Sequence, residues 1–353
     1  MDEPELARIS MELSAQVPGG GGDRGGASPA APPMMTGTPA PGTDRGRGRR
    51  RRGDAIFQML ALGAGVALLV IMAAIAVFLV LQAIPALAAD TTGFLATLKW
   101  DPDGAPVSFG IAALAFGSAL TSLLALLMSV PVAVGVALAT SHYAPYWLAR
   151  PLTYVVDLLA AVPSVVFGLW GLIYLVPHLI PPSRSLNHYL GFIPLFASNG
   201  TYGKSIFAAS IVLAVMVIPI VAAISREVFT QTPRDHIEAA WAIGATQWEV
   251  VRVAVLPYGR SGVVSGTVLG FGRAIGETIA VALVLSANYV ISPHILEPGG
   301  NTIAANIANS YGEAGDVGRG ALIASGLVLF VITLIVNFGA RAIVAKNGRA
   351  SSS

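Results

Sequence analysis

Six long apolar stretches constrain the fold of this chain more than any other feature. They cover roughly residues 55–84, 109–139, 152–177, 205–224, 262–290 and 320–340. Each reaches the ~20 residues that an α-helix needs to cross a hydrocarbon core. The sequence therefore predicts an all-α polytopic membrane protein with six transmembrane helices. Prolines inside these stretches, Pro131, Pro163 and Pro219, predict kinks.

The composition supports a membrane protein and excludes several kinds of site. Charged residues make up 11% of the chain, compared with roughly a quarter in soluble domains. The absence of cysteine excludes disulfides, Cys-ligated zinc, iron–sulfur clusters and thiol catalysis. The five histidines are scattered without ligand spacing, so the sequence predicts no metal site.

The ends of the chain differ from the middle, residues 55–340. Residues 1–54 hold 11 Gly and 7 Pro and no aromatic residue, which predicts a disordered tail. Six arginines gather at the end of this tail: Arg45, Arg47, Arg49, Arg50, Arg51 and Arg52. Such a run suits either nucleic-acid or specific lipid binding, or a cytoplasmic anchor beside the first membrane helix. We favour the anchor, with membrane lipids rather than nucleic acid as the partner.

The distribution of Lys and Arg predicts the orientation. If the N-terminus is inside, the cytoplasmic segments carry 16 Lys and Arg and the outer segments carry 4. Basic residues accumulate on the cytoplasmic side of membrane proteins. The protein is therefore expected in the plasma (inner) membrane of a bacterium. Both the 1–54 tail and the 341–353 tail are expected in the cytoplasm.

The longest connection expected on the cytoplasmic side is 225–261. Gly244 predicts a turn within it, and a capping box that begins at Thr246 predicts a helix over 247–256, ended by Pro257. Apolar knobs are expected to be exposed on this hairpin at Trp241, Trp248 and Val251. The hairpin suits either the lipid surface or a cytoplasmic protein partner.

The same loop resembles the coupling loop of importer permeases of the ATP-binding cassette class. That family carries EAA-x3-G-x9-I-x-LP, and Ala254 stands here where Ile is usual. The resemblance implies the type I importer permease fold, with this loop docked on a cytoplasmic ATPase dimer that uses the ATP. It implies no cofactor bound by this chain. The matching residues are Glu238, Ala239, Ala240, Gly244, Leu256 and Pro257.

Two charges lie deep in the fifth stretch, 262–290. Arg273 and Glu277 are expected near the middle of the bilayer, where each charge costs about 2.5–3.5 kcal/mol on insertion scales. At positions i and i+4 of one helix they would share a face and touch. This suits either a structural ion pair or a substrate path, and we favour the path. Glycines at four-residue spacing predict close helix packing: Gly262, Gly266 and Gly270 on one face, and Gly272 and Gly276 on another.

The segments GRAIGETIAV at 272–281 and LLAAVPSVVFGLWG at 158–171 resemble phosphate-specific importer permeases, the PstC-type subunit more than the PstA-type. The resemblance implies a non-enzymatic subunit that forms half of a path for inorganic phosphate. It implies a second, PstA-type permease and an extracytoplasmic phosphate-binding protein as partners. It also assigns Arg273 and Glu277 to transport.

Three alternatives stay open. One is a permease for another oxyanion, sulfate or molybdate. Another is a secondary transporter with Asp157 or Glu277 as proton carrier, and the third is a membrane sensor or scaffold that uses the basic tail. The segment 198–205, SNGTYGKS, departs from a nucleotide-binding P-loop because Ser198 replaces its first glycine.

Overall fold

The computed structural model describes residues 52–350, with side chains from 56 to 342. The chain divides into two compact units, 1–63 and 64–353. Of the first unit, only the start of one helix, 52–63, is described. The predicted 1–54 tail, apart from its last three residues, lies outside the described residues, and its arginine run does so up to Arg51.

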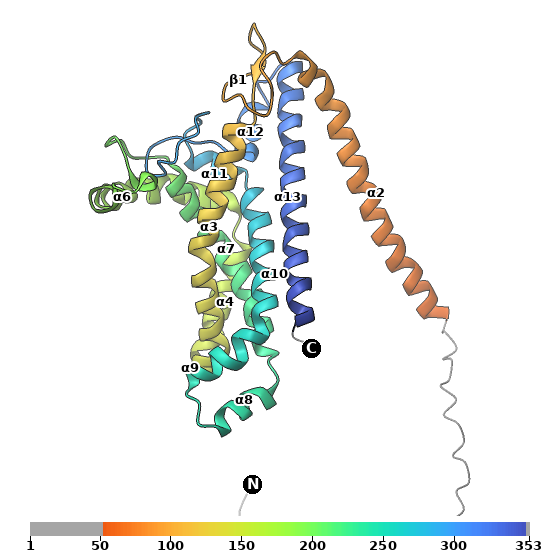
Figure 1. The fold of residues 1–353 in the computed structure, drawn as a ribbon, viewed down its shortest axis with the longest axis vertical. Helices are drawn as coiled ribbons and strands as arrows, with labels where there is room; N and C mark the ends of the chain where they lie inside the picture. The colour runs from red at the N-terminus through yellow and green to blue at the C-terminus, as the bar shows by residue number, and fades with distance from the viewer. Residues whose placement is uncertain (1–51, 351–353) are drawn as a thin grey trace, which may run out of the picture. The chain divides into compact units, whose positions relative to one another are not determined.

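The described residues are almost entirely helical (Figure 1). One small antiparallel pair of strands, β1 and β2, places Trp100 opposite Phe109. Four short helical turns interrupt or extend the α-helices: η1 Ala139–Tyr143, η2 Gly171–Leu175 and η4 Val251–Val255 are π-helical, and η3 Pro194–Phe196 is a 3₁₀ turn. The α-helices and strands are α2 Arg52–Ala89, β1 Trp100–Asp101, β2 Ser108–Phe109, α3 Ala112–Leu138, α4 Tyr146–Ala161, α5 Ser164–Trp170, α6 Val176–Leu190, α7 Ile206–Thr230, α8 Arg234–Ala242, α9 Gln247–Val250, α10 Leu256–Ile275, α11 Ile279–Val284, α12 Ile303–Ser310 and α13 Asp316–Ala350.

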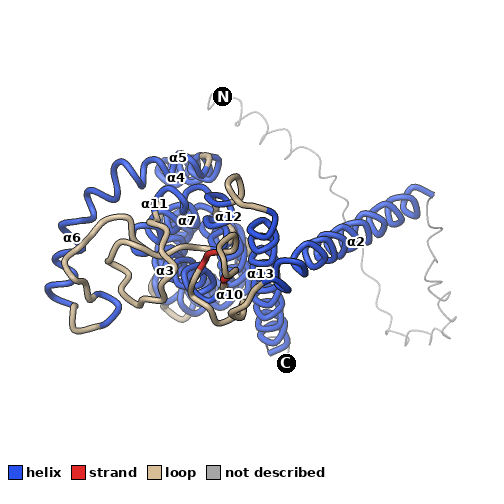
Figure 2. The backbone as a smooth tube through the Cα atoms, turned by 90° about the horizontal axis from the view of Figure 1, so that it is seen from above, coloured by secondary structure: helices blue, strands red, loops and turns tan. Residues whose placement is uncertain are grey.

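The core forms around α7, which packs against both α3 and α10. Figure 2 shows these helices gathered together, with α6 extending away from them. Close packing between α7 and α10 depends on glycine. A Cβ on Gly262 would collide with Val228, and a Cβ on Gly270 would lie 2.7 Å from a methyl carbon of Val217. The predicted Gly262–Gly266–Gly270 face is therefore confirmed, because these glycines let the two backbones approach.

Five described helices are long and apolar enough to cross a membrane, so the count of six is not confirmed. The predicted fifth span, 262–290, is not one helix. It breaks after α10 at Gly276–Thr278, and only the six residues of α11 follow before a long loop. Glycine is a poor helix former, and the Thr278 hydroxyl donates to the Gly276 carbonyl oxygen at 3.1 Å. Local polar contacts thus replace the helix ladder at this point.

The predicted third span, 152–177, is also divided. Helix α4 ends at Ala161, and Val162 is extended (ψ 129°) before Pro163 starts the next helical segment. A residue before proline avoids the helical conformation, which explains the break. The segment long enough to span a membrane is instead 164–190. Helix α3 continues through Pro131 and α7 through Pro219 without interruption.

The last helix is longer than predicted. Helix α13 continues beyond residue 340 to Ala350, so most of the expected 341–353 tail extends this helix. Helix α8 and the connection that follows it lie at one end of the bundle, and the β1–β2 pair lies at the other (Figure 1).

Candidate functional site

The 225–261 connection forms the predicted hairpin. Helix α8 ends at Ala242, and Gly244 turns the chain with a φ of +82°, a conformation that glycine adopts without a Cβ penalty. Thr246 then caps the second helix. Its backbone N–H donates to Glu249 Oε2 at 2.7 Å, and Glu249 N–H donates to Thr246 Oγ1 at 3.4 Å. The predicted capping box is confirmed.

The apolar surface of the hairpin differs from the prediction in one residue. Trp241 and Trp248 are 52% and 57% exposed, as expected. Val251 is fully buried beside Phe229 of α7, so the prediction that it is an exposed knob is wrong. Ile243, 86% exposed beside the turn glycine, takes its place. The exposure of Ile243 could be predicted from its position just before Gly244, because a residue next to a tight turn has few neighbours.

The residues of the EAA pattern occupy different environments. Ala240 is buried under the hairpin, whereas Glu238, Ala239 and Gly244 are exposed. Ala254, where the family pattern has Ile, is buried, which a small side chain permits. Leu256 is half-buried and Pro257 is exposed.

The second arm of the hairpin continues directly into α10. The predicted end at Pro257 is wrong, because α9, η4 and α10 follow one another without a gap from Gln247 to Ile275. In the π-helical turn η4, the Leu256 N–H bonds to the Val251 carbonyl, five residues back. Pro257 has no backbone N–H, and its ring would clash with a carbonyl of the preceding turn in a regular α-helix. The wider π-helical turn shifts the carbonyls before Pro257 and so accommodates the ring.

A side-chain hydrogen bond joins the hairpin to another part of the bundle. Gln247 Nε2 donates to the carbonyl oxygen of His142 at 3.1 Å. His142 belongs to η1, at the end of α3. The start of the continuous 247–275 helix is therefore linked to the end of α3, which also packs on α7.

Helix α10 presents two contrasting faces. The face against α7 is lined by Gly262, Gly266 and Gly270. A second face, about a quarter of a turn round the helix from the glycines, is exposed and carries Ser261, Ser265, Leu269 and Arg273. This chain therefore leaves uncovered a row of two serines and a leucine that ends in a cation.

Arg273 lies near the end of α10, and Glu277 lies within the helix break that follows at Gly276–Thr278. The i, i+4 helical relation that would bring them together is absent. Among residues 56–342, ion pairs link Lys99 with Asp101, Arg226 with Asp157 and His294 with Glu297, and none links Arg273 with Glu277. The Glu277 N–H instead donates to the Ala274 carbonyl at 3.3 Å.

Asp157 has a specific partner. Its carboxylate lies 3.8 Å from a guanidinium nitrogen of Arg226, near the α8 end of α7. The pair joins α4 to α7.

The 198–205 segment leads into a helix and forms no strand–loop–helix unit. Ser205 caps α7, because its hydroxyl accepts from the Ala208 N–H at 3.3 Å. The Asn199 N–H is bonded to Glu297 at 2.8 Å. These contacts anchor the loop at the β1–β2 end of the bundle.

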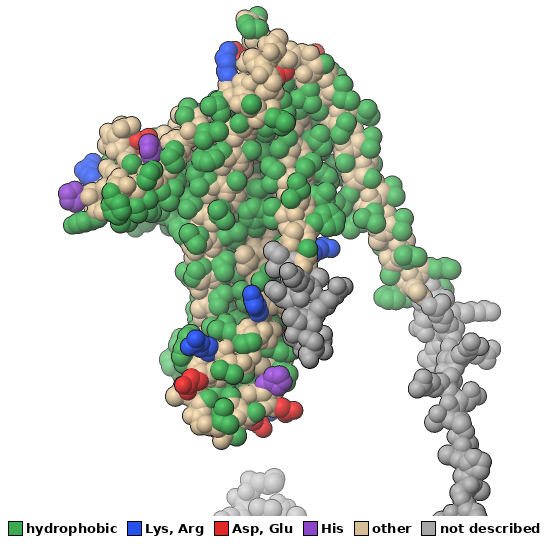
Figure 3. Space-filling view, viewed as in Figure 1, with side chains coloured by type: hydrophobic (Ala, Val, Ile, Leu, Met, Phe, Trp, Pro, Cys, Tyr) green, Lys and Arg blue, Asp and Glu red, His purple; other side chains and the backbone are tan. Residues whose placement is uncertain are grey.

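Apolar and charged side chains are separated along the surface of the bundle. Figure 3 shows apolar side chains over the middle of the visible face, while charged side chains gather toward the two ends. A band of this kind matches the hydrocarbon layer of a membrane.

Comparisons with known proteins identify a family for this chain. Residues 129–349 match the family model "Binding-protein-dependent transport system inner membrane component". The phosphate transport system permease protein PstC 2 of Mycobacterium tuberculosis is 48% identical over 298 residues, covering 83% of this chain and 92% of the relative. PstC of Xylella fastidiosa is 39% identical over 90% of this chain and 97% of its own length. A chain of the solved MetNI methionine ABC transporter covers 67% of this chain, with 17% identity and a TM-score of 0.48.

These matches confirm the resemblance to importer permeases and, within them, to the PstC-type subunit. They also confirm the prediction of a transport subunit rather than an enzyme, since the relatives are named as permeases. With several membrane-length apolar helices in a family of inner membrane components, the chain is a multi-pass membrane protein. It belongs to the family of binding-protein-dependent transport system inner membrane components.

Proposed function

We propose that this chain forms half of the translocation path of an ATP-driven importer of inorganic phosphate. The observation that carries the proposal is the exposed face of α10, where Ser261, Ser265 and Leu269 lead to Arg273. The names of the relatives, phosphate transport permeases, supply the substrate. A second permease of the PstA type closes the open side of the path.

Arg273 supplies the positive centre for the anion. Its planar guanidinium offers paired N–H donors that match phosphate oxygens, which a lysine does not. Glu277, within the break, places a negative charge after this centre. That charge weakens anion binding enough for release, since a transport site must admit an ion without retaining it.

The continuous 247–275 helix transmits the energy of ATP hydrolysis. The exposed Trp241, Ile243 and Trp248 dock on a cytoplasmic ATPase dimer, which binds and uses the ATP. A rod of this length, about 40 Å at 1.5 Å per residue, converts movement of the hairpin into movement of Arg273. Both termini are then cytoplasmic, and an extracytoplasmic phosphate-binding protein delivers the anion at the β1–β2 end.

The test is uptake of labelled phosphate by the complex reconstituted in vesicles with its ATPase, second permease and binding protein. We expect Arg273→Gln to abolish uptake while the amount of assembled complex is unchanged. Arg273→Lys should restore little, because it keeps the charge and loses the fork. The matched control is Arg341→Gln, an exposed arginine of α13 away from the α10 face. Normal phosphate uptake by Arg273→Gln would contradict the proposal.

Two further outcomes would change the proposed substrate or energy source. If sulfate or molybdate is taken up and phosphate is not, the chain serves a different oxyanion. If uptake persists without ATP, it is a secondary transporter.

A further inference from the structure

A second candidate binding site lies between α2 and α13, away from α10. Over most of its length after Ala64, α2 exposes apolar side chains and buries few of them within this chain. Near its end it meets α13, where a Cβ on Gly320 would lie 2.7 Å from the Cβ of Ala86. This glycine allows a close crossing of the two helices.

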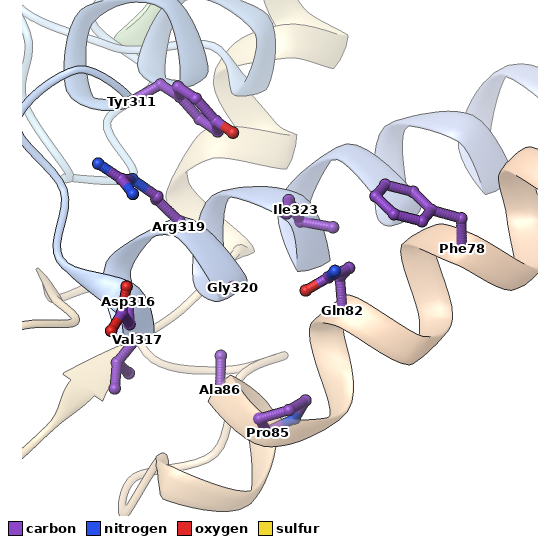
Figure 4. A pocket seen from close by; sticks show the side chains of 10 residues that line it. All are labelled: Phe78, Gln82, Pro85, Ala86, Tyr311, Asp316, Val317, Arg319, Gly320 and Ile323. Carbon is purple, nitrogen blue, oxygen red and sulfur yellow. The ribbon is translucent and has the colours of Figure 1, made fainter.

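Beside the crossing is a pocket of 470 Å³, within the range of small-molecule sites. Figure 4 shows its lining side chains, with Arg319 and Tyr311 on the same side and Gln82 across from Ile323. The lining residues are Phe78, Gln82, Pro85, Ala86, Tyr311, Asp316, Val317, Arg319, Gly320 and Ile323.

The two charged side chains of the lining lie at one end of the pocket. That end, beside the loop before α13, carries Asp316 and Arg319 with Tyr311, and Phe78 and Ile323 lie toward the far end, where Gln82 faces Ile323 (Figure 4). Ile323 follows Asp316 by seven residues, about 10 Å along a helix. A change from charged to uncharged side chains over this distance, in a groove between two membrane helices, matches a phospholipid from its phosphate to the start of its acyl chains.

The charges of the pocket also favour an anionic group. Arg319 is exposed and forms no salt bridge within the described part of the chain. Asp316 lies in the first turn of α13, where a negative charge interacts favourably with the helix N-terminus. Its carboxylate is therefore stabilised by the helix, and the guanidinium is left available for a phosphate.

We propose that this pocket binds a phospholipid from the leaflet at the β1–β2 end, with its phosphodiester on Arg319 and an acyl chain between Phe78 and Ile323. Free inorganic phosphate does not suit the pocket, because most of the lining is apolar. A helix of a partner subunit does not enter it either, since a helix with side chains is about 10 Å across and the crossing at Gly320 closes one side. The lipid covers apolar surface of α2 that this chain leaves open.

The experiment is native mass spectrometry of the full transport complex in detergent, titrated with phosphatidylglycerol. We expect one lipid to stay bound to the wild type. Arg319→Gln should weaken binding at least about tenfold, as for the loss of hydrogen bonds to a charged group. Ile323→Trp, which fills the apolar end, should weaken it too, whereas Arg341→Gln should not. Excess inorganic phosphate should not displace the lipid.

Equal lipid retention by the wild type and both pocket variants would overturn the proposal. Displacement by inorganic phosphate would assign the pocket to the free anion instead. A disulfide between Phe78→Cys and a cysteine introduced into the second permease would show a protein occupant and would also overturn it. Phosphate uptake through α10 is measured separately, so failure here leaves the proposed function intact.

Discussion

The two faces of α10 are made from the same helix and differ in what covers them. One face is Gly262, Gly266 and Gly270 packed on α7, and it is complete within this chain. The other carries Ser261, Ser265, Leu269 and Arg273 and is open. Glycine on one side brings the helix close to the core, whereas the side chains on the other side, a cation among them, are uncovered. If the proposed function holds, the comparison separates residues needed to fold from residues needed to transport.

The largest effect is expected on the packed face. Gly262→Leu should remove most of the folded protein, because its Cβ would already collide with Val228. Overpacking by a few carbons costs roughly 1–3 kcal/mol or more. The measurement is the monodisperse fraction of a fluorescent fusion in size-exclusion chromatography.

Gly272 provides the matched control on the same helix. A Cβ there meets nothing within 4 Å, so Gly272→Ala should leave the folded amount unchanged. If both glycine variants reduce folded protein equally, the two faces do not differ as described.

The next effect is expected on the open face. Ser265→Leu should leave the folded amount unchanged and reduce phosphate uptake strongly, because a branched apolar side chain narrows the path beside Arg273. Ser265→Ala, which removes only the hydroxyl, should have a smaller effect. Uptake per assembled complex in vesicles checks this. Loss of folded Ser265→Leu protein would mean that the face is packed rather than open.

A third effect tests whether the hairpin acts on the open face through the continuous helix. Gly244→Val should raise ATP hydrolysis per phosphate transported, because a β-branched residue at a φ of +82° distorts the turn. The left-handed conformation costs a non-glycine residue roughly 1–2 kcal/mol. Gly244→Asn is the control, since asparagine tolerates this conformation better. If Gly244→Val and Gly244→Asn both transport phosphate with the wild-type ratio of ATP hydrolysed, the conformation of this turn does not matter for coupling.

Local signals made the hairpin predictable and left the helix boundaries less so. The turn at Gly244 and the cap at Thr246 depend on residues within a few positions of each other. The burial of Val251 depends on Phe229, which comes from another helix. Pro257 stands inside a helix because η4 widens the turn before it, and the proline alone predicts an end there.

The residues of the proposed path show the same limit. The charges of Arg273 and Glu277 marked a candidate functional segment, and hydropathy averaged over 262–290 hid the helix break at Gly276–Thr278. Arg273 is exposed because the glycines turn a different face of α10 toward α7. The close packing predicted from the four-residue spacing is confirmed for Gly262, Gly266 and Gly270, whereas a Cβ on Gly272 would meet no atom of the described residues within 4 Å.

The smallest effect concerns the cap at the start of the 247–275 helix. The backbone N–H and hydroxyl of Thr246 donate to the Glu249 carboxylate and lower its pKa below the usual value. A group with a lowered pKa in the folded state stabilises that state above its unfolded pKa, and the stabilisation is lost as the pH falls through the folded pKa. Acidification should therefore loosen the hairpin. Thr246→Ala should cost about 1 kcal/mol of helix stability at neutral pH and weaken this pH dependence, because only the backbone donor remains. Glu249→Gln should abolish the dependence. A spin label at Ala242 would report hairpin mobility in each variant, and equal acid loosening in wild type and Glu249→Gln would show that another group controls the hairpin.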